Sequence, residues 1–521
     1  MLVGIRNASA KRWAAVFSFE GFSTILLLLC AAVALLFLAQ AARFLPVVGD
    51  NSYPESAAAL ATQRWVQGSA LYSDYRQPPY LVTAFPPLWY ALLSIPARLG
   101  FSDLDSVTLF GRLLNLTSLL GVAVLGFYWN RRLGLSLRIA LATPAIYLCF
   151  PILIPWAVTV RPDFPSLFFA LIALCLVANK ESAGWICLAG VSAAAAFLIR
   201  HNAVAVPLVS VLWLVWLRRW KHAALFCVAW GVVVGSTLTA SYLSSGGLLL
   251  LNLSGAKFGR LAVTYSRDSL LRLLVTPGHG FAVVLFIFGG MGSLYCWSDI
   301  DKRLKLLGMY LVVTLGFAVL GSAAAGGDVN HYLEPGLAMA MLAAIALERL
   351  RATWRSDSPI SAFSVIAVLV LLLPSVDMQR WKWMHERPVD LRGFVHLVQA
   401  KKVFTDIPFL AARMKPPGAL DLASLSYAAR SGGWSSATLV AKVEQKEYDG
   451  VILTESLSEA YDPTALYPRY PHLDPPLRAA LEKNYGLCFE VSSYFVYGPR
   501  LGGDGSGGNK CPSLVKTAPQ E

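Results

Sequence analysis

The sequence predicts an all-α polytopic membrane bundle of about eleven transmembrane helices, followed by a small C-terminal α/β domain. The chain of 521 residues is 56% hydrophobic and only 14% charged, a composition typical of polytopic membrane proteins. Up to about residue 375 it repeats apolar runs that approach the roughly 20 residues needed to cross the hydrocarbon core. After about residue 376 the apolar runs shorten to strand length.

The first predicted span is a long apolar run, which we interpret as a retained signal anchor because no convincing small-residue cleavage site accompanies it. The predicted spans are 21–43, 107–129, 136–155, 164–179, 184–199, 202–217, 222–243, 280–298, 304–325, 334–348 and 359–375. Together they form a predicted transmembrane domain over residues 1–375, with long exterior loops at 44–106 and 244–279.

Lysine and arginine residues cluster in the short loops on one side of the predicted bundle. These loops contain Lys11, Arg131, Lys180, Arg218, Lys302 and Arg349. The positive-inside rule assigns that side, and the N-terminus, to the cytoplasm. An odd number of spans then puts residues 376–521 and the polar clusters described below outside the cytoplasm.

Residues 376–501 alternate strand and helix patterns, which predicts the small α/β domain. Strands are expected at Val403–Thr405, Val451–Leu453 and Tyr494–Tyr497, and helices near 391–400, 436–446 and 476–485. The Gly-, Ser- and Lys-rich tail 502–521 is expected to be disordered. Cys488 and Cys511 can pair if this segment lies outside the cytoplasm, and the sequence leaves their pairing open.

The net charge is +13, but residues 376–521 hold 17 Lys and Arg against 16 Asp and Glu, so the excess lies in the membrane half. Positive-inside loops and cations that face anionic lipid explain this excess, and no nucleic acid partner is expected. The soluble part also has no Gly-rich phosphate loop or nucleotide fingerprint.

The first exterior loop holds two candidate carboxylates, Asp50 and Glu55. At the mouth of a semi-dry cavity, burial can raise the pKa of a carboxylate enough for it to act as a general base on a hydroxyl. Structural roles are also open: Glu55 can close a capping box with Ser52 at the start of a helix over 54–66, and Asp50 can be a solvated loop residue.

Further polar residues lie where predicted spans begin on the exterior side. Arg161 can hold a phosphate, or it can reach lipid headgroups. Asp163 can orient a sugar hydroxyl, or it can cap a helix. Arg200 and His201 lie between two spans joined almost without a loop, where polar groups need partners.

Asn330, Tyr332 and Glu334 precede the tenth span and are candidate substrate contacts. Pro335 suits a helix start, and the structural role of Glu334 is to complement the helix dipole.

Several of these segments together resemble the bacterial multi-spanning glycosyltransferases of the GT-C superfamily. In chain order they are Gly49–Glu55, Leu71–Asp74, Gln77–Tyr80, Phe85–Leu88, Arg161–Asp163 and Asn330–Pro335, within about residues 20–375. Relatives include protein O-mannosyltransferases and lipid A aminoarabinose transferases, which take a sugar from a polyprenyl-phosphate carrier at the outer leaflet. The resemblance implies a bacterial inner-membrane enzyme that transfers a monosaccharide from such a donor to a glycan, lipid or protein acceptor of the cell envelope.

In those families an acidic residue of the first exterior loop lies next to the reaction centre, which matches Asp50, with Glu55 as the second candidate. Many relatives carry an Asp-Glu pair there, whereas this chain has Asp50-Asn51, so the resemblance does not choose between the two. It implies an inverting displacement in which the carboxylate takes the proton of the acceptor hydroxyl. Cations or a divalent metal would meet the charge on the leaving phosphate, and the metal stays an open question. The available cations are Arg161, Arg200, Lys257, Arg260 and Arg267.

The alternative function is a transporter or flippase of lipid-linked sugars. Transporters keep ionisable residues near the bilayer midplane on broken helices, whereas the interiors of these predicted spans are almost free of charge, which favours the enzyme. A polysaccharide polymerase or ligase would share the donor and differ in the acceptor.

Overall fold

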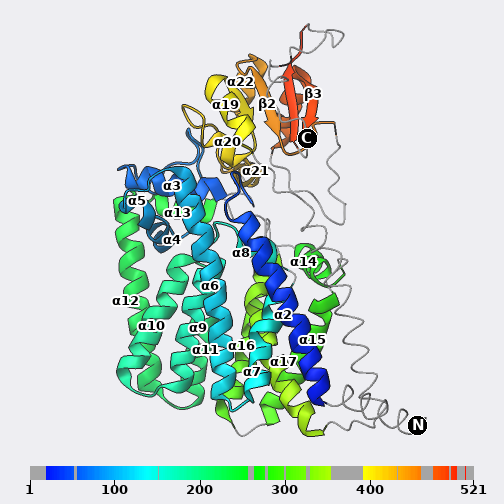
Figure 1. Cartoon of the computed structure of the whole chain (residues 1–521). Helices are drawn as coiled ribbons and strands as arrows, with labels where there is room; N and C mark the ends of the chain where they lie inside the picture. The colour runs from blue at the N-terminus through cyan, green and yellow to red at the C-terminus, as the bar shows by residue number, and fades with distance from the viewer. Residues whose placement is uncertain are drawn as a thin grey trace, which may run out of the picture.

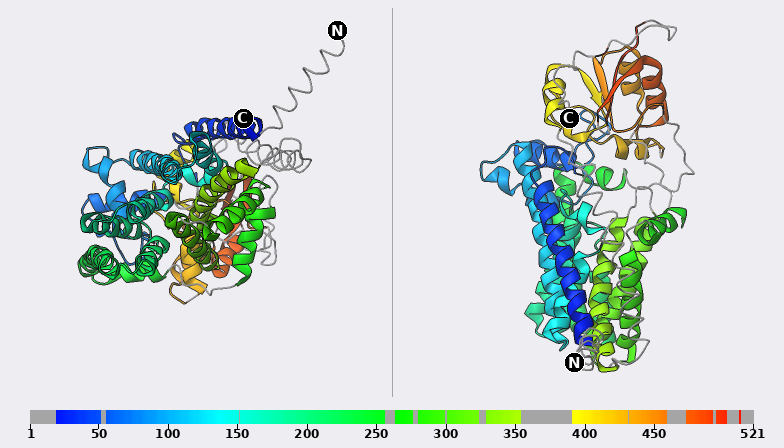
Figure 2. Two further views of the ribbon diagram at one scale, coloured as in Figure 1. Left: turned by 90° about the horizontal axis from the view of Figure 1, so that it is seen from below. Right: turned by 45° about the vertical axis from the view of Figure 1, so that its right-hand side comes forward.

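In the computed structural model a long helical bundle carries a small sheet with its own helices at one end (Figure 1). The two further views in Figure 2 show the same stacking. The structure describes residues 19–51, 55–150, 152–255, 263–275, 280–298, 301–323, 329–353, 391–430, 432–458, 473–491, 494–501 and 511.

The bundle is built from helices that match the predicted apolar runs. They are α2 Phe19–Phe44, α6 Leu104–Arg132, α7 Leu137–Leu148, α9 Asp163–Asn179, α10 Ala183–Ile199, α11 Ala205–Trp216, α12 Trp220–Ser244, α15 Gly280–Ser298, α16 Lys302–Ser322 and α17 Leu333–Thr353. Four of them, α2, α6, α12 and α16, are long and apolar enough to cross a membrane. The run 359–375 lies outside the described residues, so the total number of spans stays a prediction.

Neighbouring helices approach closely where one of them carries a glycine. A Cβ on Gly190 of α10 would lie 2.7 Å from the Phe226 carbonyl oxygen of α12, and a Cβ on Gly292 of α15 would collide with the Leu342 carbonyl of α17. Small residues at contacts of this kind let the backbones of membrane helices pack together.

Contacts between turns show which helix ends lie together. Arg219, between α11 and α12, pairs at 2.6 Å with Glu181, between α9 and α10. The Lys305 ammonium at the start of α16 lies 5.9 Å from the Trp216 ring centre at the end of α11. Ser136, just before α7, donates to Glu348 near the end of α17 at 2.9 Å. These cation-rich turns lie at the end of the bundle opposite the sheet (Figure 1).

Short helices cover the sheet end of the bundle. They are α3 Glu55–Val66, α4 Pro87–Leu93, α5 Ile95–Arg98, α13 Leu248–Gly255 and α14 Val263–Val275. The helix predicted over 54–66 is confirmed as α3. The segment 244–279, predicted as a loop, contains two helices, and α14 buries residues at helical spacing, Ser266, Ser269 and Leu273.

The C-terminal part holds a four-stranded sheet in the order β1-β2-β4-β3. The strands are β1 Val403–Thr405, β2 Gly450–Leu453, β3 Tyr485–Val491 and β4 Tyr494–Pro499, and the helices are α19 Arg392–Ala400, α20 Pro408–Ala411, α21 Leu422–Arg430, α22 Ala437–Glu444 and α23 Pro475–Asn484. β1 is parallel to β2, and the other two pairs are antiparallel. All three predicted strands are present, whereas the edge strand β3 was not expected.

Cys488 of β3 forms a disulfide with Cys511, which answers the question that the sequence left open. Cys511 belongs to the tail 502–521, whose other residues lie outside the described part of the chain. The domain boundaries at 375 and 501 stay predictions.

Candidate active site

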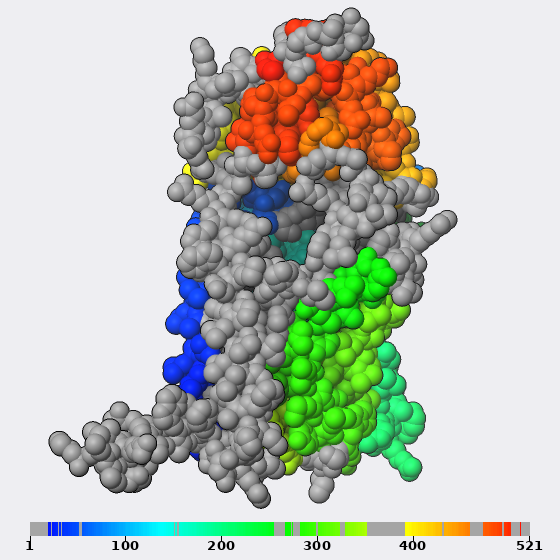
Figure 3. Space-filling model, turned by 90° about the vertical axis from the view of Figure 1, so that its right-hand side faces the viewer, coloured from blue at the N-terminus to red at the C-terminus, as the bar shows by residue number. Residues whose placement is uncertain are grey.

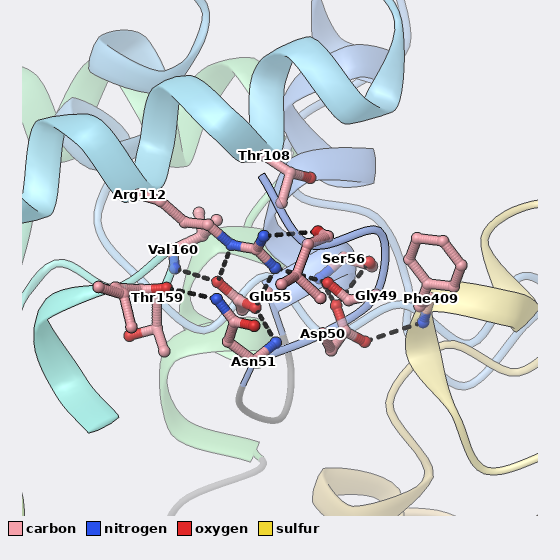
Figure 4. Close-up of polar contacts among 12 residues, drawn as sticks. Gly49, Asp50, Asn51, Glu55, Ser56, Thr108, Arg112, Thr159, Val160 and Phe409 are labelled. Atoms are coloured by element: carbon pink, nitrogen blue, oxygen red, sulfur yellow. Dashed lines mark hydrogen bonds and ion pairs between the residues drawn. The ribbon is translucent and has the colours of Figure 1, made fainter. Parts of the chain in front are cut away.

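Glu55, the first residue of α3, is buried in a network of donors at the sheet end of the bundle (Figure 4). Its Oε1 accepts hydrogen bonds from Arg112 Nε at 3.1 Å and from the Val160 N–H at 2.6 Å. Its Oε2 accepts from Arg112 Nη2 at 2.9 Å and from the Asn51 N–H. The side chains of Glu55 and Arg112 are each 1% exposed, so this is a buried ion pair with both carboxylate oxygens engaged.

Arg112 of α6 also fixes the chain that leaves α2. Its Nη1 donates to the carbonyls of Leu45 at 3.1 Å and Val47 at 2.7 Å, and its Nη2 donates to Gly49 at 2.5 Å. Sequence reasoning missed this residue, although an arginine inside a predicted apolar span needs a partner and was the available signal. Arg112 lies about two turns into α6, so it is an exception to the expectation that the interiors of the spans are almost free of charge.

Asp50 is held differently, by uncharged donors (Figure 4). Its Oδ1 accepts from the Ser56 N–H at 2.9 Å and from the Ser56 hydroxyl at 2.6 Å. Its Oδ2 accepts from the Phe409 N–H at 2.9 Å, a backbone group of α20 in the C-terminal part. Burial, and then the negative charge of Glu55, raise the pKa of Asp50 to about 6. This carboxylate is therefore poised to exchange a proton near neutral pH.

A second polar cluster surrounds Asp163, the first residue of α9. Its Oδ1 pairs with Arg200 Nη1 at 3.1 Å and accepts from Asn330 Nδ2 at 3.0 Å. The α9 terminus has no side-chain capping bond, so Asp163 acts in an ion pair rather than as the expected helix cap. The Arg161 guanidinium lies 3.9 Å from the centre of the Trp156 ring.

One stretch of backbone, residues 156–163, joins the two clusters. It begins in α8 Leu153–Ala157 and ends at α9. Asn115 of α6 donates to the carbonyls of Trp156 at 2.6 Å and Thr159 at 3.0 Å, and Asn51 donates to Val158 at 2.8 Å. Because the Val160 N–H also reaches Glu55, this stretch connects the Glu55 network to Arg161 and Asp163.

The structure also places the other predicted residues. His201 is partly exposed in the turn between α10 and α11. Tyr332 ends the 3₁₀ helix η1 Val329–Tyr332 and is 1% exposed, and its hydroxyl has no hydrogen-bond partner in the described part of the chain. Glu334, in the first turn of α17, lies next to the buried Tyr310 of α16.

The cations of the second exterior loop are not part of these clusters as far as the structure describes them. Arg267 lies on α14, is 66% exposed and pairs with its neighbour Asp268 at 3.1 Å. Lys257 and Arg260 fall outside the described residues.

Blue and teal segments, from the early part of the chain, are visible between the C-terminal sheet and the ends of the bundle helices (Figure 3). Within the described ranges, no three or more His, Cys, Asp or Glu residues gather as metal ligands.

Comparison with known proteins gives structural matches but none in sequence. No protein-family model matches the chain, and no curated protein sequence matches it. ArnT from Cupriavidus metallidurans bound to undecaprenyl phosphate matches with a TM-score of 0.56 and 14% identity, over 95% of this chain and 99% of ArnT. The oligosaccharyltransferase AglB from Archaeoglobus fulgidus, in complex with an inhibitory peptide and a dolichol-phosphate, matches with a TM-score of 0.51 and 12% identity, over 91% of this chain and 74% of AglB. The chain therefore shares the fold of ArnT and AglB.

Proposed function

We propose that this chain is an inverting glycosyltransferase of the bacterial inner membrane, which transfers a monosaccharide from a polyprenyl-phosphate donor to a hydroxyl of a cell-envelope acceptor. The observation that carries the proposal is the Asp50 carboxylate, which lies where the bundle meets the C-terminal part and has a pKa raised to about 6. The shared fold supports the donor class, because the matching structures of ArnT and AglB hold undecaprenyl phosphate and a dolichol-phosphate.

Asp50, rather than Glu55, is the proposed general base. Glu55 accepts four hydrogen bonds, two on each oxygen, so its lone-pair sites are filled. Asp50 has no ion-pair partner within the described residues, and burial and then the negative charge of Glu55 raise its pKa.

In the proposed reaction, Asp50 takes the proton of the acceptor hydroxyl while the hydroxyl oxygen bonds to the anomeric carbon. The bond from that carbon to the phosphate oxygen breaks, and the electron pair leaves with the polyprenyl phosphate. The configuration inverts because attack and departure occur on opposite faces. No general acid is needed, because the leaving phosphate is already a stable anion. We propose that Arg161 and Arg200 stabilise its negative charge.

We further propose that the sheet end of the bundle faces away from the cytoplasm. The cation-rich turns lie together at the opposite end, which is the cytoplasmic end by the positive-inside rule. A disulfide in the C-terminal part fits an oxidising compartment.

The test is the variant Asp50→Asn, which keeps the size of the side chain and removes the proton acceptor. General-base loss typically lowers turnover about 100- to 10,000-fold. Purified protein would receive a panel of undecaprenyl-phosphate monosaccharides and an envelope extract, and the release of undecaprenyl phosphate would be measured. Wild-type release should rise as the pH rises through about 6, because the base must be ionised to act.

Asp74→Asn is the matched control. It makes the same change in the same exterior loop, at a partly exposed aspartate that pairs with Arg76 at 2.8 Å, and should leave turnover unchanged. Full turnover in Asp50→Asn would refute the base. A wild type that binds undecaprenyl phosphate but releases none from any donor would instead support the transporter or flippase.

A further inference from the structure

The C-terminal part contacts the proposed base directly. The Phe409 N–H belongs to the first turn of α20, where helical N–H groups have no partner within their own helix. It donates to Asp50 Oδ2 at 2.9 Å, across 359 residues of sequence. This contact joins the two parts of the chain at the carboxylate itself.

Several other contacts hold α20 in place against the first exterior loop. The Leu391 N–H donates to the Val48 carbonyl at 3.1 Å, and the Leu420 N–H donates to the Pro79 carbonyl at 3.3 Å. Arg413, just after α20, forms an ion pair with Asp105 at the start of α6. Ala411 and Ala412 pack in the same apolar cluster as residues 57–61 of α3. The Phe409 N–H is therefore held rigidly relative to Asp50.

The hydrogen bonds of Asp50 leave a defined place for a proton. A carboxylate offers about four lone-pair sites, two on each oxygen. Ser56 provides two donors to Oδ1, and Phe409 provides one donor to Oδ2. Among the described residues, the remaining acceptor site thus lies on Oδ2, next to the bond from Phe409.

We propose that Phe409 is a positioning residue whose backbone N–H fixes Oδ2 of Asp50, so that the docked C-terminal part completes the proposed base. This inference rests on the proposed function, because it gives Asp50 the role of base. The N–H stabilises the ionised carboxylate and directs its remaining acceptor site. Without it, Asp50 would hold its proton more tightly and would rotate away from the acceptor hydroxyl.

Other charged and titratable groups also face Asp50, and they stay in place in the variants below. Glu55 lies on α3, Arg112 on α6, Arg413 follows α20, and Tyr494 lies on β4. A change in pH dependence on altering residue 409 would therefore report the lost N–H rather than a lost charge.

Two substitutions separate the N–H from the side chain. Phe409→Pro removes the N–H and the ring, and proline suits the first turn of a helix. Phe409→Ala removes the ring, which lies 3.6 Å from the Arg413 guanidinium, and keeps the N–H. Replacing Phe409 by its α-hydroxy acid keeps the ring and removes the N–H, although the ester also weakens the Pro408 carbonyl that accepts from the Ala412 N–H. This variant serves if a second proline directly after Pro408 prevents folding.

The release of undecaprenyl phosphate from the undecaprenyl-phosphate monosaccharide panel would be measured for each variant from pH 5 to pH 9. For the two variants without the N–H, we expect the acid limb of the rate to move up by about one pH unit, as for a lost hydrogen bond to a charged group. At pH 8, where Asp50 is ionised in every variant, kcat should fall about 10-fold with little change in KM for the donor, because the base is misoriented. Phe409→Ala should keep the wild-type acid limb.

The results distinguish this inference from the proposed function. Suppose that Asp50→Asn abolishes turnover, but the two variants without the N–H have the same acid limb and the same kcat as Phe409→Ala. The positioning role of Phe409 is then overturned, whereas the role of Asp50 as the base stands. If Asp50→Asn is fully active, the proposed function fails first.

Discussion

The two carboxylates between α2 and α3, Asp50 and Glu55, show how surroundings divide similar groups between structure and chemistry. Glu55 points into the bundle, where it forms an ion pair with Arg112. It also accepts a hydrogen bond from the backbone N–H of Val160, so it holds the chain before α9 in place. Asp50 points towards the C-terminal part and meets only uncharged donors. Burial raises the pKa of Asp50, which keeps one acceptor site among the described residues, whereas the four donors on Glu55 fill its lone-pair sites. The comparison predicts that a change at Glu55 affects folding and that a change at Asp50 affects turnover.

The largest expected effect is therefore on stability, at Arg112. Arg112→Met leaves the buried Glu55 without its cation, and breaking a buried ion pair in this way costs about 3–5 kcal/mol. We expect little monodisperse protein in detergent and a strongly lowered melting temperature. Glu55→Gln should act in the same direction, because it leaves Arg112 uncompensated.

The control is the double variant Glu55→Gln with Arg112→Met, which removes both charges. It should recover part of the lost stability, since no buried charge is left alone. If the single variants are as stable as the wild type and lose turnover instead, the division between the two carboxylates is wrong.

A smaller effect is expected at the Asp163–Arg200 pair, which resembles the Glu55–Arg112 pair in chemistry but is more open. The Arg200 side chain is 17% exposed, against 1% for Arg112, so part of its guanidinium is accessible to a ligand. Arg200→Gln should leave the protein folded and lower kcat/KM for the donor by about 10- to 100-fold, the value of one charge-assisted hydrogen bond. Unchanged kcat/KM would move the phosphate contact away from Arg200.

Local sequence patterns predicted the secondary structure of the bundle well. The apolar runs match the bundle helices, and the helix predicted over 54–66 matches α3. These features depend on neighbours within one or two turns, so the sequence carries them directly. In the C-terminal part the same reasoning found β1, β2 and β4 but missed β3, whose edge position leaves it with partly exposed residues and a weaker apolar pattern.

The candidate site was predicted only in outline. Sequence position placed Asp50, Glu55, Asp163 and Arg200 on one face but left the choice between Asp50 and Glu55 open. That choice depends on Arg112, 57 residues from Glu55, and on a backbone N–H 359 residues from Asp50. A backbone donor leaves no signal in residue type, so only a structure reveals it. Arg112 did leave a signal, a charge within an apolar run, and could have been found.

The smallest effect is expected at Arg267, the matched arginine outside both clusters. It pairs with an adjacent aspartate as Arg200 pairs with Asp163, but it is 66% exposed on α14. Exposed ion pairs are worth about 0–1 kcal/mol, so Arg267→Gln should change kcat/KM for the donor by less than about fivefold in detergent without anionic lipid. The assay is the same release of undecaprenyl phosphate, run beside Arg200→Gln. If Arg267→Gln raises the donor KM as much as Arg200→Gln does, α14 contributes to the phosphate site. The exposure of an arginine would then not predict whether it binds the donor. If only Arg200→Gln has an effect on the donor KM, the increasing exposure of the three arginines corresponds to three roles. Arg112 then supports folding, Arg200 binds the donor, and Arg267 is a surface charge.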